Sequence, residues 1–302
     1  MRNEISSAQR ALVIVPTYNE RENLPLLVDA LLRLRFDPSA SAQGRPEHGR
    51  TGDHAHRPEA LEGELSLDVL VVDDNSPDGT GEIADGLARA NPHVKALHRA
   101  GKLGLGTAYL DGFRFGLKEG YGFLLSMDCD FSHDPRYVPA LLKRAESAGL
   151  VIGSRYVAGG TTRGWALHRK LISRTANAVV RLLLGLRTRD TSAGFRCFRR
   201  EALELVGLGA ISSKGYNVLE EMVYRCEKAR VRIVEAPIVF VDRQRGATKI
   251  SFRDMVGVGL LVVRLLLERF LKQPAGSGAL ARPSGGTIRR AADSRGREAT
   301  RA

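Results

Sequence analysis

The sequence predicts an α/β domain with a mainly parallel central sheet. Short apolar runs rich in β-branched residues occur at residues 11–15, 68–72 and 150–152. The first two are each followed by a polar loop and then by apolar residues at helical spacing. Strands that appear as continuous apolar runs and alternate with helices are typical of parallel sheets that are buried on both faces.

Composition limits the classes of function. The 302 residues suffice for one domain with a hydrophobic core, and 43% hydrophobic content fits a globular protein with polar appendages. The net charge of +12 indicates anionic partners, namely nucleic acid, anionic lipid or phosphorylated small molecules. Three cysteines without CxxC spacing favour a reduced, cytosolic compartment. We expect no signal peptide, because no apolar segment precedes Ala11. We also expect no membrane-spanning helix, because no run of 18 apolar residues occurs.

The first unit is a strand at 11–15, closed by Pro16, and a helix at 23–34. The loop between them follows the carboxyl end of the strand, where open α/β sheets bind ligands. Tyr18 and Glu20 in this loop fit a ligand site and fit equally a turn and the first turn of a helix.

Two segments lack any periodicity and are predicted to be disordered. Residues 37–64 form an insertion rich in Gly, Pro, Ser, Ala, Arg and His, and residues 272–302 form a basic tail. His54 and His56 in the insertion do not predict a metal site, since a flexible loop without converging ligands seldom binds metal tightly.

The second unit is a strand at 68–72 and a helix at 80–90, joined by turn residues at 75–79. Asp73 and Asp74 are not explained by the turn. Two adjacent carboxylates at a strand end repel each other and require a partner, which a ribose diol or a cation would supply. We therefore favour a ligand role for Asp74.

A third strand at 95–98 leads into a glycine-rich loop at 99–108 and a helix at 108–119. The glycine spacing matches neither a dinucleotide-binding loop nor a P-loop. The loop is therefore interpreted as flexible, with Lys102 able to face a phosphate.

The central feature is a strand at 123–125 that leads into Asp128 and Asp130. Residues 132–135 end this segment and open a helix at 138–148. Two carboxylates one residue apart at a strand end can hold a hard divalent cation against a phosphate. The sequence thus predicts a metal–phosphate site here.

The second half adds basic residues. A strand at 150–155 ends in Arg155. The basic, amphipathic helix at 167–186 either shows a solvated face or lies on an anionic membrane, and the charged apolar segment 255–271 is a possible interfacial helix. The other expected elements are a loop at 156–162, a turn and strand at 190–198, a helix at 218–229, a strand region at 231–241 and a basic loop at 242–249.

Nine motifs occur in order and carry a family resemblance. They are VIVPTYNERENLPLLV, VVDDNSPDGT, KLGLGTAYLDG, MDCDFSHDP, GSRYVAGG, RKLISRTAN, SAGFRCF, SKGYNVLEEM and FVDRQRGATK. Over about residues 11–250 the chain resembles the polyprenol (dolichyl) phosphate mannosyltransferases of glycosyltransferase family 2. The resemblance implies a Rossmann-like GT-A domain at 1–271 and inverting transfer of mannose from GDP-mannose to a polyprenyl phosphate.

The resemblance also implies roles for the matching positions. Asp128 and Asp130 would hold Mg²⁺ or Mn²⁺ with the GDP diphosphate and, with Arg155 and Arg169, form the catalytic group. The expected acceptor-phosphate residues are Arg155, Arg169 and Ser173. The expected nucleotide-sugar residues are Pro16, Tyr18, Glu20, Val72, Asp74, Asp128, Cys129, Asp130, Arg155, Arg243 and Lys249.

Two departures from the family pattern are visible. Cys129 stands where relatives commonly have Ala, and the insertion at 37–64 is long but is expected to lie away from the site. Unlike in some relatives, no long hydrophobic anchor domain is expected after residue 271. Membrane attachment is therefore expected to be peripheral, on the cytoplasmic face, through an anionic membrane surface or a membrane-anchoring partner protein.

A phosphate monoester acceptor fits this composition. It is largely dianionic at neutral pH and already nucleophilic, so the site needs cations and positioning more than a general base. Two alternatives remain: a family 2 transferase that uses a UDP-sugar such as UDP-glucose, and a non-catalytic basic protein that binds membrane or nucleic acid. No nucleic-acid partner is expected, because no such motif occurs and aromatic content is 6%.

Overall fold

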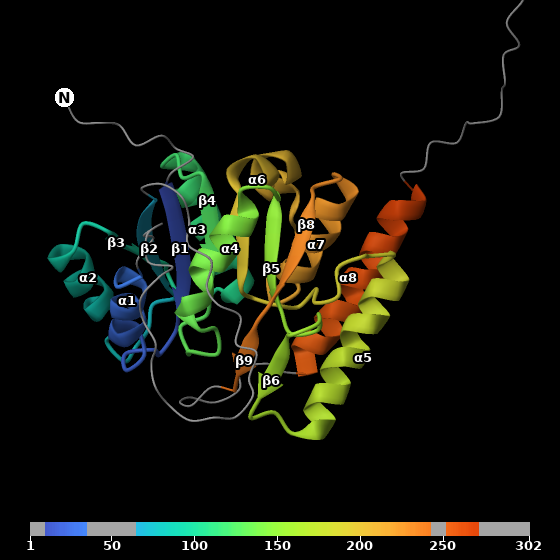
Figure 1. Ribbon diagram of the computed structural model, residues 1–302, viewed down its shortest axis with the longest axis horizontal. Helices are drawn as coiled ribbons and strands as arrows, with labels where there is room; N and C mark the ends of the chain where they lie inside the picture. The colour runs from blue at the N-terminus through green and yellow to red at the C-terminus, as the bar shows by residue number, and fades with distance from the viewer. Residues whose placement is uncertain (1–9, 35–64, 243–251, 272–302) are drawn as a thin grey trace, which may run out of the picture.

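A computed structural model describes residues 10–34, 65–242 and 252–271 (Figure 1). The predicted insertion at 37–64, the predicted ligands Arg243 and Lys249, and the predicted tail at 272–302 lie outside these ranges. The strands are β1 (Arg10–Thr17), β2 (Ser66–Asp73), β3 (Val94–His98), β4 (Phe123–Ser126), β5 (Leu150–Ser154), β6 (Thr161–Arg163), β7 (Arg196–Arg199), β8 (Ile233–Pro237) and β9 (Val239–Val241). The helices are α1 (Leu24–Leu32), α2 (Thr80–Ala90), α3 (Leu105–Lys118), α4 (Val138–Ala145), α5 (Leu167–Leu184), α6 (Arg200–Val206), α7 (Val218–Lys228) and α8 (Phe252–Leu271).

The central sheet has seven strands in the order β3-β2-β1-β4-β7-β5-β8. All of them run parallel except β7, which pairs antiparallel with both β4 and β5. A separate parallel pair joins β6 to β9. The expected α/β class with a mainly parallel sheet is confirmed.

The apolar runs of the sequence are strands buried on both faces. In β1, Leu12 and Ile14 face one core, which includes residues of α3 and α7. Ala11, Val13 and Val15 face the other core, which includes residues of α1, α2 and α4. Because alternate residues point to opposite faces and both faces are covered, the strand shows no polar alternation.

Three segments differ from the sequence expectation. Residues 161–163 form β6, where a loop was predicted, and the unpredicted helix α6 follows β7 directly. The single strand region predicted at 231–241 divides into β8 and β9. Pro237 ends β8 because proline lacks the N–H that would continue the ladder, and the chain then pairs with β6.

Helices α5 and α8 lie side by side at one end of the molecule (Figure 1). Gly185 ends α5 in a left-handed conformation (φ 67°), which glycine adopts without steric cost. Within the described ranges, no helix is both long and apolar enough to cross a bilayer.

Candidate active site

Candidate residues from four loops meet at one edge of the sheet. Strands β1, β2, β4 and β5 point the same way, so their carboxyl ends open on the same side. The loop after each of these four strands carries predicted ligand residues, from Tyr18 after β1 to Arg155 after β5. This edge is where open α/β sheets bind their ligands.

Asp128 and Asp130 follow β4 and are held by their surroundings. The buried hydroxyl of Tyr109 donates to Oδ1 of Asp128 at 2.6 Å, and the Asp128 N–H donates to Nδ1 of His133 at 3.2 Å. Burial, and then Asp128, raises the pKa of Tyr109 well above its ordinary value, so the phenol stays a donor. Burial lowers the pKa of His133, which keeps the ring neutral, with its proton on Nε2.

The carboxylate pair fits a divalent cation that shares its ligands with a phosphate. The Asp128 side chain is about 30% exposed, and Gly194 beside it has no side chain to fill the approach. No group of three or more His, Cys, Asp and Glu side chains forms a closed metal site in the described part of the chain. Mg²⁺ typically takes one or two carboxylates together with substrate phosphates and water, and the donor set present matches that pattern.

The predicted nucleotide residues flank the carboxyl ends of β1 and β2. Pro16 and Val72 are register partners in these adjacent strands. Nζ of Lys102 lies 4.1 Å from the centroid of the Tyr18 ring. Glu20 accepts a hydrogen bond from Asn23 at 2.8 Å, just before α1, so the structure shows the helix-start contact that the sequence allowed. The ligand roles of these residues stay predictions.

Asp73 and Asp74 have protein partners that the sequence did not reveal. Asp73 accepts hydrogen bonds from Thr17 and Ser76. Asp74 pairs with buried Arg99 and accepts the N–H of Gly104 at 3.1 Å. These contacts explain how two adjacent carboxylates coexist, and they show that Asp74 fixes the glycine-rich loop.

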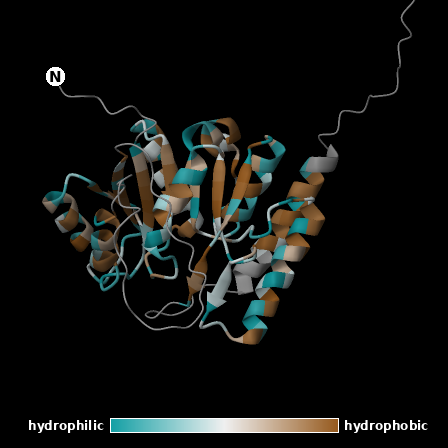
Figure 2. Ribbon diagram, viewed as in Figure 1, coloured by the Kyte–Doolittle hydropathy of each residue, from teal (hydrophilic) through white to brown (hydrophobic). Residues whose placement is uncertain are grey.

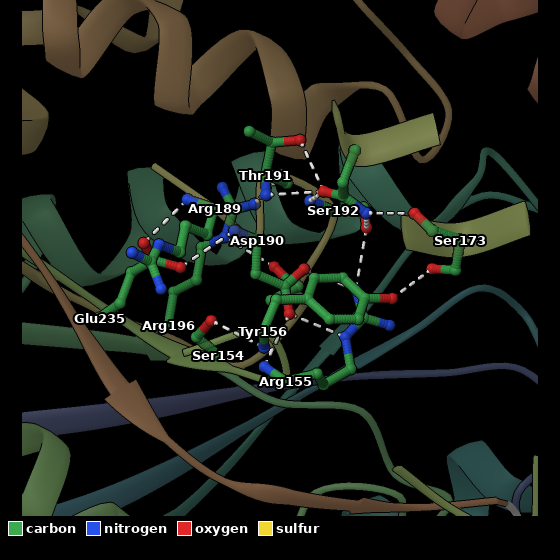
Figure 3. A network of polar contacts seen from close by, with 12 residues as sticks. Ser154, Arg155, Tyr156, Ser173, Arg189, Asp190, Thr191, Ser192, Arg196 and Glu235 are labelled. Carbon is green, nitrogen blue, oxygen red and sulfur yellow. Dashed lines mark hydrogen bonds and ion pairs between the residues drawn. The ribbon is translucent and has the colours of Figure 1, made fainter. Parts of the chain in front are cut away.

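Arg155 is the centre of a buried polar network (Figure 3). Its Nε and Nη2 donate to the two oxygens of Asp190 at 2.8 and 2.6 Å, and its backbone N–H also donates to Asp190. Ser192 accepts a further bond from Nη2. Burial would lower the pKa of Arg155, but Asp190 outweighs it and the pKa is raised, so the guanidinium stays charged.

The other two predicted acceptor-phosphate residues lie close to this network. Ser173 shares a 2.6 Å hydrogen bond with the hydroxyl of Tyr156, the neighbour of Arg155. Arg169 pairs with Asp242 at 2.9 Å. The Trp165 ring lies 4.2 Å from the guanidinium carbon of Arg169 and 5.5 Å from that of Arg155. Trp165 thus lies beside both arginines, and Tyr156 connects Arg155 with Ser173.

Comparison with known proteins identifies the family. The model of a family described as "Glycosyl transferase family 2" matches residues 12–207, more than half of the chain. The chain belongs to glycosyltransferase family 2. The predicted family and enzyme class are therefore confirmed, and the alternative of a non-catalytic basic protein is excluded.

Two relatives of this family 2 glycosyltransferase are similar over most of their length. Polyprenol monophosphomannose synthase of Mycolicibacterium smegmatis is 44% identical over 249 residues, which cover 82% of this chain and 83% of the relative. Undecaprenyl-phosphate mannosyltransferase of Micrococcus luteus is 44% identical over 242 residues, which cover 80% of this chain and 88% of the relative.

Solved structures confirm the GT-A fold. Glucosyl-3-phosphoglycerate synthase from Mycobacterium tuberculosis, in complex with Mn²⁺, UDP and glucosyl-3-phosphoglycerate, matches with a TM-score of 0.54 at 19% identity. The match covers 86% of this chain and 79% of that chain. A structure of the same enzyme with Mg²⁺ and UDP matches with a TM-score of 0.53.

Sequence reasoning missed several residues of the site of this family 2 glycosyltransferase. Asp190 lay in a stretch interpreted as a turn into a strand, yet it is fully buried and pairs with Arg155, 35 residues away. Tyr109 was hidden in a helix of mixed character. The sequence did contain a signal for Asn177. This polar residue lies at helical spacing with the apolar Val180 and Leu184, and all three are on the buried face of α5.

Sequence reasoning also did not identify Glu220 of α7 as a buried carboxyl near the Arg155 network. Its Oε2 is buried without a hydrogen-bond partner in the described chain. Burial raises its pKa from the ordinary 4.5 to about 7, although Arg196 acts in the opposite direction. The folded protein therefore keeps this proton to a higher pH than the unfolded chain does, and the free energy of unfolding falls as the pH rises from about 4.5 to 7.

Substituting Glu220→Gln should remove this penalty. We expect the variant to gain Tm relative to the wild type, by roughly 5 °C more at pH 8 than at pH 5, because only the wild type must ionise a buried group. Thermal unfolding at both pH values measures the difference. Glu201→Gln, at an exposed carboxyl of α6, is the control, and an equal gain at the two pH values for Glu220→Gln would contradict the assignment.

Proposed function

We propose that this enzyme transfers mannose from GDP-mannose to a polyprenyl phosphate and releases GDP. The observation that carries the proposal is the pairing of two subsites: carboxylates suited to a metal-bound diphosphate, and an arginine cluster suited to a second phosphate. Asp128 belongs to the first and Arg155 to the second. The two 44% identical relatives, named for mannose transfer to polyprenyl phosphates, support the same substrate class.

The expected reaction is a single displacement. A phosphate oxygen of the acceptor attacks C1 of mannose as the bond from C1 to the diphosphate oxygen breaks, and its electron pair leaves with GDP. The configuration at C1 inverts. The attacking dianion carries no proton that must be removed, which agrees with a site built from cations.

The protein's own groups orient the two phosphates. Nε and Nη2 of Arg155 are engaged by Asp190, and within the described chain its Nη1 makes no hydrogen bond, so this nitrogen can serve an anion. Arg169 would add a second cation once a phosphate competes with Asp242. A Mg²⁺ or Mn²⁺ ion held by Asp128 and Asp130 would stabilise the charge on the leaving diphosphate.

The donor and the transfer are tested together. Purified protein is incubated with undecaprenyl phosphate and Mg²⁺ and with either labelled GDP-mannose or labelled UDP-glucose, and the lipids are extracted. We expect label in the lipid from GDP-mannose only, and a Tm increase with GDP and Mg²⁺ that exceeds the increase with UDP. Transfer from UDP-glucose alone would establish the alternative donor. The absence of label in the lipid with both donors would refute the transferase proposal.

The acceptor is a membrane lipid, and α5 and α8 present the surface that we propose meets the membrane. Most of the exposed large apolar side chains in the described chain belong to these two helices. Figure 2 shows hydrophobic residues along both of them. The exposed side chains are Leu167, Leu171, Ile172, Val179, Leu182, Leu183, Leu260, Val263 and Leu267. We call this set the apolar face; contiguous exposed apolar surface of this kind marks an interaction site.

The opposite side of α5 belongs to the acceptor subsite. Ser173 and Asn177, on the inner side, reach the Arg155 network. Lys170, Arg174 and Arg181 recur at helical spacing beside the apolar face, as in helices that lie in an anionic interface. We therefore propose peripheral attachment at the cytoplasmic face, with the phosphate of the acceptor entering beside α5.

Weakening the apolar face should separate membrane binding from chemistry. The double variant Leu171→Gln and Leu182→Gln is expected to reduce co-sedimentation with anionic vesicles at least about tenfold, since burying one leucine contributes roughly 1.5–3 kcal/mol. Transfer to vesicle-borne undecaprenyl phosphate should fall with it, and transfer to water-soluble geranyl phosphate should not. Leu205→Gln, at an exposed leucine of α6, is the control; vesicle binding of the double variant at wild-type strength would refute the surface.

A further inference from the structure

The segment 190–195 touches both halves of the proposed site. At its start, Asp190 and Ser192 accept hydrogen bonds from Arg155. At its end, Gly194 lies against Asp128, such that a Cβ on this glycine would be 3.5 Å from Oδ2. Ser126 of β4, just before the carboxylates, donates to the Gly194 carbonyl at 2.7 Å. The conformation of these few residues thus links the place of Arg155 to the place of Asp128.

Arg196 holds this segment from inside the core. Its guanidinium is fully buried and donates to the carbonyls of Thr191 and Ala193, each at 2.7 Å. A third bond, also of 2.7 Å, reaches the carbonyl of Leu219 in α7. Figure 3 shows Arg196 beside Asp190 and Thr191.

A charge at position 196 is costly to bury. Burial lowers the pKa of Arg196 to about 10, which reflects the cost of keeping the ion in the core. Among the described ion pairs none includes Arg196, so carbonyl dipoles supply its direct contacts. An apolar side chain of similar volume is often at least as stable as a buried charge. The carboxylates of Glu220 and Asp190 favour the charged form of Arg196, and its three hydrogen bonds hold the segment and α7 together.

Asn177 of α5 holds the same segment from the other side. Its Oδ1 accepts from the N–H and the hydroxyl of Thr191, both at 2.9 Å. Its Nδ2 donates to Ser192 and to the carbonyl of Ser173, each at 3.0 Å. One amide therefore joins the segment to the helix that carries the predicted acceptor residues.

We infer that Arg196 and Asn177 are positioning residues for sugar transfer, which act by fixing the segment 190–195 and through it the guanidinium of Arg155 relative to Asp128. Neither residue needs to touch a substrate. The inference rests on the proposed function, because it assigns Arg155 to the acceptor phosphate. Reacting groups must be held to a fraction of an ångström, and a displacement of about 1 Å can cost roughly a hundredfold in rate.

The test uses the variants Arg196→Lys and Asn177→Ala in the full chain. Lysine keeps the charge but cannot reproduce the three-way fork of hydrogen bonds. We expect kcat with geranyl phosphate and GDP-mannose to fall at least about tenfold in either variant at saturating substrates, in protein shown to be folded by circular dichroism. Arg199→Gln, on the same strand but with a partly exposed side chain, should retain the wild-type kcat.

A double-mutant cycle with Arg155→Lys separates positioning from general stabilisation. If Arg196 acts through Arg155, adding Arg196→Lys to Arg155→Lys should lower the rate by much less than it does in the wild type. Rate losses that multiply in the cycle, or folded single variants with wild-type kcat, would overturn the inference. Should Arg196→Lys not fold, Asn177→Ala, which removes only a side-chain amide, supplies the same cycle.

The wild-type protein distinguishes this inference from the proposed function. Trp165 is the only tryptophan, and its ring lies 5.5 Å from the guanidinium carbon of Arg155, so its fluorescence reports on the acceptor subsite. If geranyl phosphate neither changes this emission nor accepts mannose in the wild type, the proposed function fails. If the wild type does both and the variants match it, only the positioning roles fail.

Discussion

Replacing Asp130 by Asn is expected to lower sugar transfer by about a thousandfold or more while the protein stays folded. The carboxylate would hold the cation that stabilises the leaving diphosphate, and loss of such charge stabilisation costs several kcal/mol in the transition state. The fold should survive, because Oδ1 of Asp130 accepts the N–H of Ser132 at 3.1 Å and an asparagine oxygen can do the same. We expect a Tm within about 2 °C of the wild type.

Transfer and thermal unfolding should be measured on the same preparation, together with Mn²⁺ binding in the presence of GDP. Asp134→Asn is the matched control. This carboxylate lies four residues further along the loop, begins the turn at Pro135–Tyr137 and pairs with exposed Arg136. It should transfer at the wild-type rate. A folded Asp130→Asn protein with near-normal turnover would remove Asp130 from the metal site.

The sequence was sufficient to predict the sheet and its ligand edge. A strand covered on both faces, such as β1, leaves an uninterrupted apolar run, and that run directly indicates a parallel α/β sheet. Helix α2 has the predicted bounds of 80–90, because Gly79 and Asp78 give a clear start to an amphipathic pattern. Since parallel strands end at one edge, the loops after them could be assigned to one site.

Local sequence patterns did not predict the order and direction of the strands. The segment that forms β7 appears from its residues as a strand, but nothing in Arg196–Arg199 shows that it enters antiparallel between β4 and β5. This insertion brings Asp190 beside Arg155 and Gly194 beside Asp128. The positioning segment was therefore invisible before its tertiary neighbours were known.

The sequence also did not predict which residues pair with the charged side chains. Adjacent Asp73 and Asp74 suggested a missing ligand, yet Thr17 and Arg99 supply partners from 56 and 25 residues away. Such pairs depend on which loops the sheet places together. Sequence reasoning could identify the carboxylates as unusual, but it could not distinguish a ligand site from a contact that holds a loop.

The second large effect is expected from Arg155→Lys. Lysine preserves the charge but not the planar fork that donates to both oxygens of Asp190 and to Ser192. Because Asp190 is fully buried, the lost bonds cannot be replaced by water, and part of its desolvation cost becomes uncompensated. We expect a Tm decrease of several degrees and a fall in kcat/KM for geranyl phosphate of about a hundredfold.

Arg136→Lys is the matched control for this prediction. Arg136 makes a similar pair of bonds to Asp134, at 2.9 and 2.6 Å, but its side chain is 84% exposed. Exposed ion pairs contribute roughly 0–1 kcal/mol, so this variant should keep wild-type Tm and turnover. The two substitutions share one chemistry and differ in burial and position. If Arg155→Lys lowered Tm but left kcat/KM for geranyl phosphate unchanged, Arg155 would hold the core and not the acceptor, and the second phosphate would have to be sought nearer Arg169.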